Sequence, residues 1–389
     1  MNVGIICEYN PLHLGHIRQF EAVRNHFGKD CRIICLMSGN FVQRGQPAVL
    51  DKSVRAKAAV KSGADLILEL PITASLSSAE GFAAAGVRIL SPICDYLCFG
   101  TESGTESSLM RTARALLSPA FSVYLKESLE GGLSFPAARA LALEQMGISP
   151  KNLQKPNDIL ATEYCKAILS SGSSLEIFPI HRPGSYHDLE ADEENPSATA
   201  VRSLMLQCGL WQDYVPVEAG AVLQDASLHT IAAGERAMLG RLRTMTDEEF
   251  EALPYGSEGL WRKFMHACRE RSTLEGILNT AKSKRYTRTR LDRMAMCAFL
   301  GLACQDLEEK QPYVRVLAFS QQGRAILKQS KEKLRLVNAG ERTESPFWER
   351  ENRCSDLYGL FSNDAPEAPG QELRRRVFYQ KSSPTESEA

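Results

Sequence analysis

The sequence lacks the features that would place it in a membrane or outside the cell. No apolar run approaches the roughly 20 residues that a membrane-spanning helix requires. An apolar, strand-like segment begins at Val3, which leaves no room for the charged and apolar regions of a signal peptide. We therefore expect a cytoplasmic protein that has no membrane partner.

The chain also lacks a net charge of either sign. Its 46 Lys and Arg residues nearly balance its 47 Asp and Glu residues, which gives a formal net charge of -1. A surface that binds nucleic acid must therefore be a local patch and cannot be a property of the whole molecule.

None of the 11 cysteines forms a C-x-x-C pair, the spacing typical of many zinc and redox sites. Cys31/Cys35 and Cys94/Cys98 have three residues between them and lie in apolar runs. We expect buried thiols in a reducing compartment, with zinc as the weaker alternative. The sequence shows no cluster of carboxylates typical of a Mg²⁺ or Ca²⁺ site, so no residue is predicted to be a metal ligand.

What the first half of the chain does contain is a regular alternation of short apolar runs and helical patterns. The apolar runs predict five strands, over residues 3–7, 33–37, 66–70, 96–99 and 175–180. The alternation predicts an α/β fold with a Rossmann-like parallel sheet. Since ligands of such sheets bind beyond the carboxyl ends of the strands, we expect the site in the loops after the first, second and fourth strands.

The pattern changes after Gly209, where helical periodicity takes over and continues to about Ala339. From about Asn363 the chain is rich in Pro, Ser and Glu. We predict an α/β domain that holds the site over 1–210, a mainly α-helical domain over 211–362, and a flexible tail over 363–389.

The first strand leads into the stretch that carries the most chemistry, His13-Leu14-Gly15-His16. A helix pattern begins at about His16, so both imidazoles can lie at a helix N-terminus, which attracts phosphate. Gly15 permits a ligand to approach the backbone closely. Positioned donors of this kind stabilise the negative charge that develops during nucleotidyl transfer. The alternative is a pair of solvated histidines in a loop.

A second helix start can bind phosphate, at Ser197-Ala198-Thr199 with Arg202 one turn later. Its hydroxyls, free N–H groups and guanidinium can hold the β- and γ-phosphates, although Ser197 or Thr199 can equally be an ordinary cap. Gly100, Asn157 and Arg182 have the same two interpretations, as nucleotide contacts or as a turn, a cap and a surface cation.

The most basic stretch, residues 282–293, has six Lys or Arg residues and one acid, Asp292. A basic helix with Tyr286 can bind the phosphates of RNA, but a solvated helix face is the commoner explanation. A second basic cluster, at Gln43-Arg44 and at Lys52, Arg55 and Lys57, lies close to the expected site.

Several motifs together resemble one known family. The first, Glu8-Tyr9-Asn10-Pro11-x-His13-x-Gly15-His16, resembles the loop of the HIGH-type nucleotidyltransferases, and more narrowly that of the tRNA(Met) cytidine acetate ligase family. The other matching segments span most of the chain before the tail: 37–48, 62–65, 69–71, 99–100, 155–160, 186–188, 197–199, 284–287 and 312–317. The loop after the second strand and the Lys284-Arg285-Tyr286-Thr287 run are more specific than the two histidines.

The resemblance implies a ligase that activates acetate with ATP to acetyl-adenylate and then acetylates the wobble cytidine of elongator tRNA(Met), forming N4-acetylcytidine. ATP would be a substrate, accompanied by Mg²⁺, and no tightly bound cofactor is expected. The resemblance places the nucleotide contacts in residues 6–19 and at Gly100, Asn157 and Arg182. His13 and His16 would stabilise the reacting phosphate, while Arg202 with the Ser197/Thr199 helix start would hold the departing pyrophosphate.

The full prediction assigns two sets of binding residues. The ATP-binding set is Ile6, Cys7, Glu8, Tyr9, Asn10, Pro11, Leu12, His13, Leu14, Gly15, His16, Gly100, Asn157, Arg182, Ser197, Thr199 and Arg202. The tRNA-binding set is Lys282, Lys284, Arg285, Arg288 and Arg290.

Leu14 departs from the family pattern, in which a small polar residue, often Asn, is expected. Leu12 stands in place of Phe. A missing side-chain contact at Leu14 would weaken nucleotide binding without abolishing activity. Two alternatives remain at this stage: a nucleotidyltransferase that adenylylates a small phosphorylated metabolite, and a non-catalytic RNA-binding protein.

Overall fold

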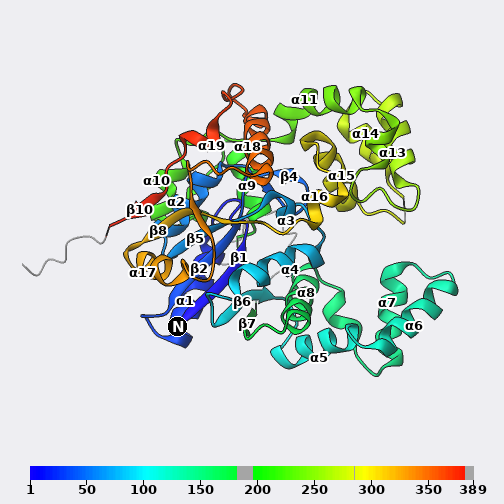
Figure 1. Ribbon diagram of the computed structural model, residues 1–389, viewed down its shortest axis with the longest axis horizontal. Helices are drawn as coiled ribbons and strands as arrows, with labels where there is room; N and C mark the ends of the chain where they lie inside the picture. Colours follow the sequence, from blue (N-terminus) through cyan, green and yellow to red (C-terminus); the bar gives the residue numbers. More distant parts are fainter. Residues whose placement is uncertain (182–195, 284, 382–389) are drawn as a thin grey trace, which may run out of the picture.

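The computed structural model describes residues 1–181, 196–283 and 285–381. Its main element is a sheet of eight strands in the order β10-β8-β5-β2-β1-β6-β7, with β9 also paired to β8 (Figure 1). The strands are β1 (Asn2–Cys7), β2 (Arg32–Ser38), β5 (Leu66–Leu70), β6 (Tyr96–Thr101), β7 (Glu176–His181), β8 (Val314–Ser320), β9 (Leu336–Asn338) and β10 (Phe378–Gln380). All neighbours are parallel except β5 and β8. The five strands predicted from the first half are confirmed.

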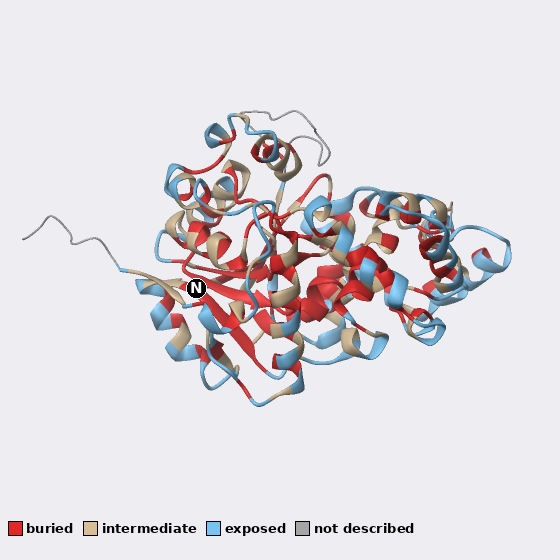
Figure 2. Ribbon diagram, turned by 90° about the horizontal axis from the view of Figure 1, so that it is seen from above, coloured by how far each residue is buried: buried red, intermediate tan, exposed pale blue. Residues whose placement is uncertain are grey.

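Helices cover both faces of this sheet. Because side chains alternate along a strand, Ile33, Cys35 and Met37 of β2 face one helical layer, and Ile34 and Leu36 face the other. The buried interior of the sheet stands out in Figure 2. The first layer contains α1 (Leu14–Phe27), α2 (Lys52–Lys61), α9 (Ala198–Leu206) and α10 (Val217–Leu223). The second contains α4 (Ala79–Leu90), α5 (Glu106–Leu116), α8 (Pro156–Ser171) and α17 (Gln321–Ser330).

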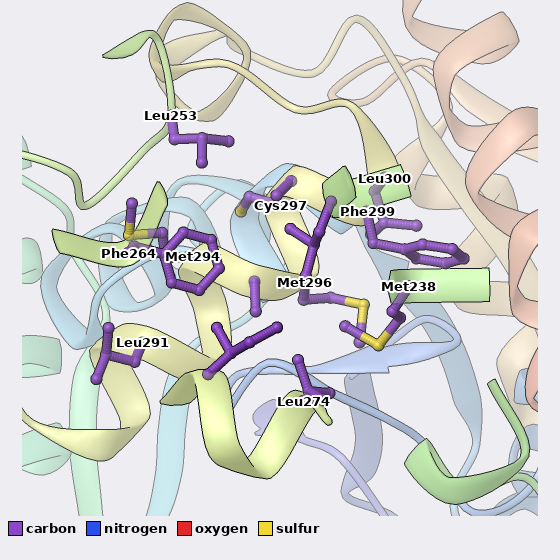
Figure 3. Close-up of a cluster of buried hydrophobic side chains, with 14 of the residues drawn as sticks. Met238, Leu253, Phe264, Leu274, Leu291, Met294, Met296, Cys297, Phe299 and Leu300 are labelled. Atoms are coloured by element: carbon purple, nitrogen blue, oxygen red, sulfur yellow. The ribbon is translucent and has the colours of Figure 1, made fainter. Parts of the chain in front are cut away.

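A second hydrophobic core lies in the helical part that follows residue 230. It is built mainly by α11 (Ile231–Thr244), α12 (Asp247–Glu251), α13 (Leu260–Glu270), α14 (Leu274–Ala281) and α15 (Arg288–Leu300). Figure 3 shows side chains of this core, among them Met238, Leu274 and Met296. Phe41 of the short hairpin β3 (Phe41–Val42)–β4 (Gln46–Pro47) joins the same core, so the hairpin connects the sheet to the helices.

The remaining helices either project from the molecule or pack at the borders of these cores. Next to α5, α6 (Pro119–Glu130) and α7 (Phe135–Gln145) project from the molecule in Figure 1. Three further helices are short, namely α3 (Ile72–Ser75), α16 (Cys304–Glu308) and α19 (Gln371–Arg374). The helix α18 (Pro346–Tyr358) has more than three turns. No helix in the described part of the chain combines the length and apolarity needed to cross a bilayer.

The last fifth of the chain returns to the sheet, contrary to the expectation from helical periodicity. We expected helices to about Ala339, but β8 pairs antiparallel with β5, and β9 and β10 pair with β8. The expected tail contains β10 and the buried Arg375, whose guanidinium bonds the Asp51 carboxylate. The pairing of β8 with β5 and the contact of Arg375 with Asp51 join residues that are some 250 and 324 positions apart, which local periodicity does not register. The boundaries at 210 and 362 stay a prediction.

Candidate functional site

The loop between β1 and α1 places two histidines at a helix N-terminus. His13 is the N-cap of α1, and its Nδ1 accepts a hydrogen bond from Gly15 N at 3.1 Å. His16 Nδ1 accepts one from His13 N at 3.2 Å, which completes a reciprocal capping box. The helix therefore begins at Leu14, two residues before the expected start. The two ring centroids are 3.8 Å apart.

This capping arrangement fixes the chemistry of both rings. A ring nitrogen that accepts a backbone N–H carries no proton, so in each neutral imidazole the proton is on Nε2. His13 is only 1% exposed, and Tyr9 packs edge-on to His16 with ring centroids 4.9 Å apart. The result is a rigid pair of Nε2–H donors at the positive end of a helix, suited to an anion.

The second predicted phosphate-binding helix start lies beside the first. Ser197 is the N-cap of α9, and its Oγ accepts from Ala200 N at 3.0 Å. Arg202 donates to Thr199 Oγ1 at 3.1 Å and to the carbonyl oxygen of Asn10 at 2.5 Å. The guanidinium thus connects α9 to the loop that carries the histidines. Ser197 caps the helix and also lines the cavity described below, and its contact with phosphate stays a prediction.

A buried arginine fixes the loops after β1 and β2 relative to each other. Arg55 of α2 is fully buried and donates only to backbone carbonyls in its described contacts. Its Nη1 lies 2.5 Å from Glu8 O and 3.1 Å from Ser38 O, and its Nη2 bonds Gly39 O. In addition, Glu8 Oε1 accepts from Gln43 N at 2.9 Å. These contacts hold the β3–β4 hairpin against the first loop.

The loop after β6 is held by two acids. Asp158 Oδ1 accepts from the backbone N–H groups of Glu102, Ser103 and Gly104 at 2.9, 3.2 and 3.3 Å. In return, Glu102 accepts from Asn157 Nδ2 at 2.9 Å and from Asp158 N at 3.2 Å. This exchange joins the start of α8 to the end of β6 and fixes Gly100 and Asn157 on one side of the site.

These loops surround one cavity of about 1150 Å³. It lies beyond the carboxyl ends of β1 and β6, where the parallel sheet predicted it. The predicted ATP-binding residues that line it are Ile6, Cys7, Glu8, Tyr9, Asn10, His13, Gly15, His16, Gly100, Asn157, Ser197, Thr199 and Arg202.

Four residues of the predicted set are not among the lining residues. Leu12 is fully buried in the core of the first helical layer, and Pro11 is buried beside it. Leu14 is the first residue of α1 and also lies outside the lining. Arg182 falls outside the described residues, although its neighbour His181 lines the cavity.

The basic stretch does not form one helix. Lys282 lies after the end of α14, and α15 begins only at Arg288. Acids partner three of its five described cations: Arg285 and Arg290 lie 3.0 and 3.9 Å from Glu258, and Arg288 bonds both Glu275 and Asp292. Tyr286 is buried and donates to Glu258 O at 2.8 Å, so it is not a platform for stacking.

The placement of the tRNA-binding set differs from residue to residue. Lys282 is exposed, Arg290 bonds Tyr255 O and Ser257, and Lys284 falls outside the described residues. The assignment of this set to tRNA stays a prediction.

Two members of the second basic cluster lie inside the protein, whereas Gln43 and Arg44 line the cavity, close to the site as expected. Lys52 is 1% exposed and Arg55 is fully buried. Lys52 Nζ lies 2.6 Å from Glu69 and 2.8 Å from Glu372, inside the protein. Neither cation can contact RNA. The sequence could not reveal this, because charged residues are only rarely buried and because Glu372, one partner of Lys52, and Glu8 O, one acceptor of Arg55, are far from them along the chain.

The site also contains residues that the sequence analysis did not assign. Glu102, His229, Thr289 and Asp292 line the cavity, and Asp158 and Arg55 hold its loops without lining it. No three His, Cys, Asp or Glu residues of the described part cluster as metal ligands do.

Comparison with known proteins agrees with this geometry. A family model described as HIGH Nucleotidyl Transferase matches residues 1–372. A tRNA(Met) cytidine acetate ligase of Clostridium novyi is 37% identical over 353 residues, which cover 86% of this chain and 88% of that protein. One of Acetivibrio thermocellus is 32% identical, over 97% of this chain and 99% of that one.

Solved structures give the same result. The crystal structure of apo Thermotoga maritima TmcAL superimposes with a TM-score of 0.90 at 28% identity, over 98% of this chain and 100% of that chain. The form of that protein bound with alpha-thio ATP gives a TM-score of 0.86. The chain therefore belongs to the HIGH nucleotidyltransferases and, within them, to the tRNA(Met) cytidine acetate ligase family.

Proposed function

We propose that this protein is an ATP-dependent ligase that activates acetate as acetyl-adenylate and transfers the acetyl group to the wobble cytidine of elongator tRNA(Met). One observation carries the proposal: the His13–His16 pair caps α1 inside a cavity that extends from the sheet to the helical part. A minimal nucleotidyltransferase for a small metabolite does not need a cavity wall that is built by a second, helical part. The acceptor, tRNA(Met), is inferred from the relatives, which are tRNA(Met) cytidine acetate ligases.

In the first step, an acetate oxygen attacks the α-phosphorus of ATP and pyrophosphate leaves. Negative charge grows on the phosphate oxygens, and the two Nε2–H groups are placed to stabilise it without moving. Arg202, already oriented by Asn10 O and Thr199, is placed to hold the departing pyrophosphate with the N-terminus of α9.

In the second step, the exocyclic amine of cytidine attacks the acetyl carbon of the mixed anhydride and AMP leaves. An anticodon base is unpaired before binding, so exposing it costs little. Mg²⁺ would enter with the phosphates of ATP and supply charge neutralisation there. The eleven free cysteines support a location in the cytoplasm, since thiols persist in a reducing compartment.

The direct test is mass spectrometry of tRNA(Met) after incubation with the protein, ATP and isotopically labelled acetate. We expect the label in an acetyl group on one cytidine of the anticodon. An absence of label, with tRNA bound and ATP consumed, would contradict the proposed acceptor. An adenylylated small phosphorylated metabolite among the products would favour the other nucleotidyltransferase reaction.

The histidine role is tested by His13→Asn. Asparagine is a good N-cap and keeps an oxygen acceptor for Gly15 N, but it lacks the imidazole. We expect acetate-dependent ATP–pyrophosphate exchange to fall by about 100-fold or more, the size of effect seen when one such donor is removed. The melting temperature should change little. An exchange rate within twofold of the wild type would contradict the assignment.

A further inference from the structure

A second hollow of about 350 Å³ adjoins the main cavity within the helical part. Its walls come from the β3–β4 hairpin, α11, α14 and α15. Gln46, Ile231, Arg288 and Asp292 line both hollows, so these four residues lie at their junction. Much of the wall is apolar, including Met238 and Leu274 from the core in Figure 3. The volume is near the lower end of the roughly 300–1,000 Å³ typical of small-molecule pockets.

An oriented carboxylate lies at this junction. Asp292 Oδ1 accepts from Arg288 Nε at 2.8 Å. The two terminal nitrogens of the same guanidinium donate to Glu275 at 2.8 and 2.6 Å, so all three groups are fixed. Among the residues that the structure describes, none donates to the second oxygen of Asp292, Oδ2, although its side chain is only 10% exposed. A partly desolvated acceptor of this kind favours a ligand with an N–H donor.

Asp292 is also held firmly relative to the nucleotide site. Gly45 of the hairpin has φ +74° and packs on the backbone of α15, where an added Cβ would lie 2.5 Å from the carbonyl carbon of Asp292. The hairpin is in turn bonded to Glu8 of the β1–α1 loop through Gln43 N. A continuous set of contacts therefore connects the loop of the histidines with the carboxylate.

The small hollow fits an amino-bearing heterocycle better than an anion. Three carboxylates, those of Glu235, Glu275 and Asp292, line it against one arginine that they already partner in part. Acetate or phosphate would therefore meet an excess of negative charge. Cytosine offers a flat apolar face and an exocyclic amine, and aspartate accepts from that amine in known base recognition. Uracil presents a carbonyl oxygen at the same position, which a carboxylate repels.

We propose that this hollow receives the acceptor cytosine and that Asp292 Oδ2 accepts a hydrogen bond from its exocyclic N4 amine, so that Asp292 selects cytosine over uracil. The inference rests on the proposed function, since it assumes a cytidine acceptor. It adds a specificity residue and a place for the base. Arg288 acts through Asp292 as a positioning residue.

The test uses the full-length chain, Asp292→Asn, and two anticodon stem-loops that differ only by C or U at the wobble position. Asparagine keeps the acceptor for Arg288 and can also donate to the carbonyl of uracil. We expect the wild type to bind the C stem-loop about tenfold more tightly, and the variant to lose that preference. Transfer of labelled acetyl to tRNA should fall by about tenfold, while acetate-dependent ATP–pyrophosphate exchange persists.

Asp247→Asn is the matched control, because Asp247 is an exposed aspartate of the same helical part that lines neither hollow. A variant that keeps the preference for C, or that loses exchange together with transfer, would overturn the assignment of the base. If the wild type itself fails to acetylate tRNA, the proposed function fails instead, so the two failures are distinguishable.

Discussion

Arg55 shows how one buried residue determines the position of several others that contact substrate. Its guanidinium donates to carbonyl groups at Glu8, Ser38, Gly39 and Leu50, which come from two different loops. Lysine at this position would keep the charge but lose the planar fork that reaches these oxygens together. The loops at the carboxyl ends of β1 and β2 would then separate.

We expect Arg55→Lys to lower the free energy of unfolding by about 3 kcal/mol, because several buried carbonyls lose their donors at roughly 1–3 kcal/mol each. ATP affinity should fall as well. Urea denaturation and calorimetric titration with ATP measure the two effects. Lys61→Gln, at the other end of the same helix, serves as control. Unchanged ATP affinity in a destabilised Arg55→Lys would show that the loops are held by other contacts.

Among the structural elements, the short β3–β4 hairpin connects the nucleotide site with the helical part of the molecule. It carries Phe41 into the helical core, lines both hollows through Gln46, and packs Gly45 on α15. An alanine at 45 meets both a left-handed φ and backbone atoms of Asp292 and Arg293 at 2.5 Å, which cannot rotate away.

We expect Gly45→Ala to push the hairpin from α15, to destabilise the protein by about 1–3 kcal/mol, and to slow acetyl transfer more than ATP–pyrophosphate exchange. Gly301→Ala is the control, because Gly301 has φ +67° at the end of the same helix and no atom within 4 Å of an added Cβ. Equal effects of the two substitutions on transfer would refute a special role for the hairpin contact.

The sequence predicted those elements whose signals are local. The strands of the first half depend on neighbouring residues, and the structure contains them, while the helix after the first strand begins two residues earlier than its pattern predicted. Asp158 was not assigned a role, because the N–H groups that donate hydrogen bonds to it lie 54 to 56 positions away in the sequence. Arg315 interrupts an apolar run, and only its three buried acidic partners explain a charge inside a strand.

For the molecule as a whole, a buried network of charges connects the sheet to the returning chain. Glu372 lies between three cations: Lys52 at 2.8 Å, Arg315 at 3.1 Å and Arg375 at 2.9 Å. Burial by itself would raise the pKa of Glu372, but the attraction of Lys52, Arg315 and Arg375 outweighs it and lowers this pKa to about 2. Burial raises the pKa of the neighbouring Glu351 carboxyl, although Arg315 opposes it.

A lowered pKa in the folded state makes the stabilising contribution of Glu372 pH-dependent. The contribution is complete above the unfolded pKa of about 4.3 and is lost as the pH falls toward about 2. We expect Glu372→Gln to destabilise the protein by roughly 3–5 kcal/mol at pH 7, since it leaves buried cations without their partner. The difference from the wild type should shrink by about 3 kcal/mol between pH 5 and pH 2.

Urea unfolding at a series of pH values measures this difference. Glu349→Gln, at an exposed acid on α18, should leave the pH dependence as it is in the wild type. A difference between Glu372→Gln and the wild type that stays constant down to pH 2 would exclude the assigned role of Glu372.

The antiparallel pairing of β5 with β8 has a consequence for synthesis on the ribosome. Ser320 Oγ donates to Asp65 Oδ1 at 3.0 Å across 255 residues of sequence. A nascent chain therefore exposes the open edge of β5 until β8 has emerged, at a translation rate of roughly 5–20 residues per second. Unpaired edges of this kind template association between chains. We expect the interval between these two strands to be the period in which the growing chain most needs a chaperone.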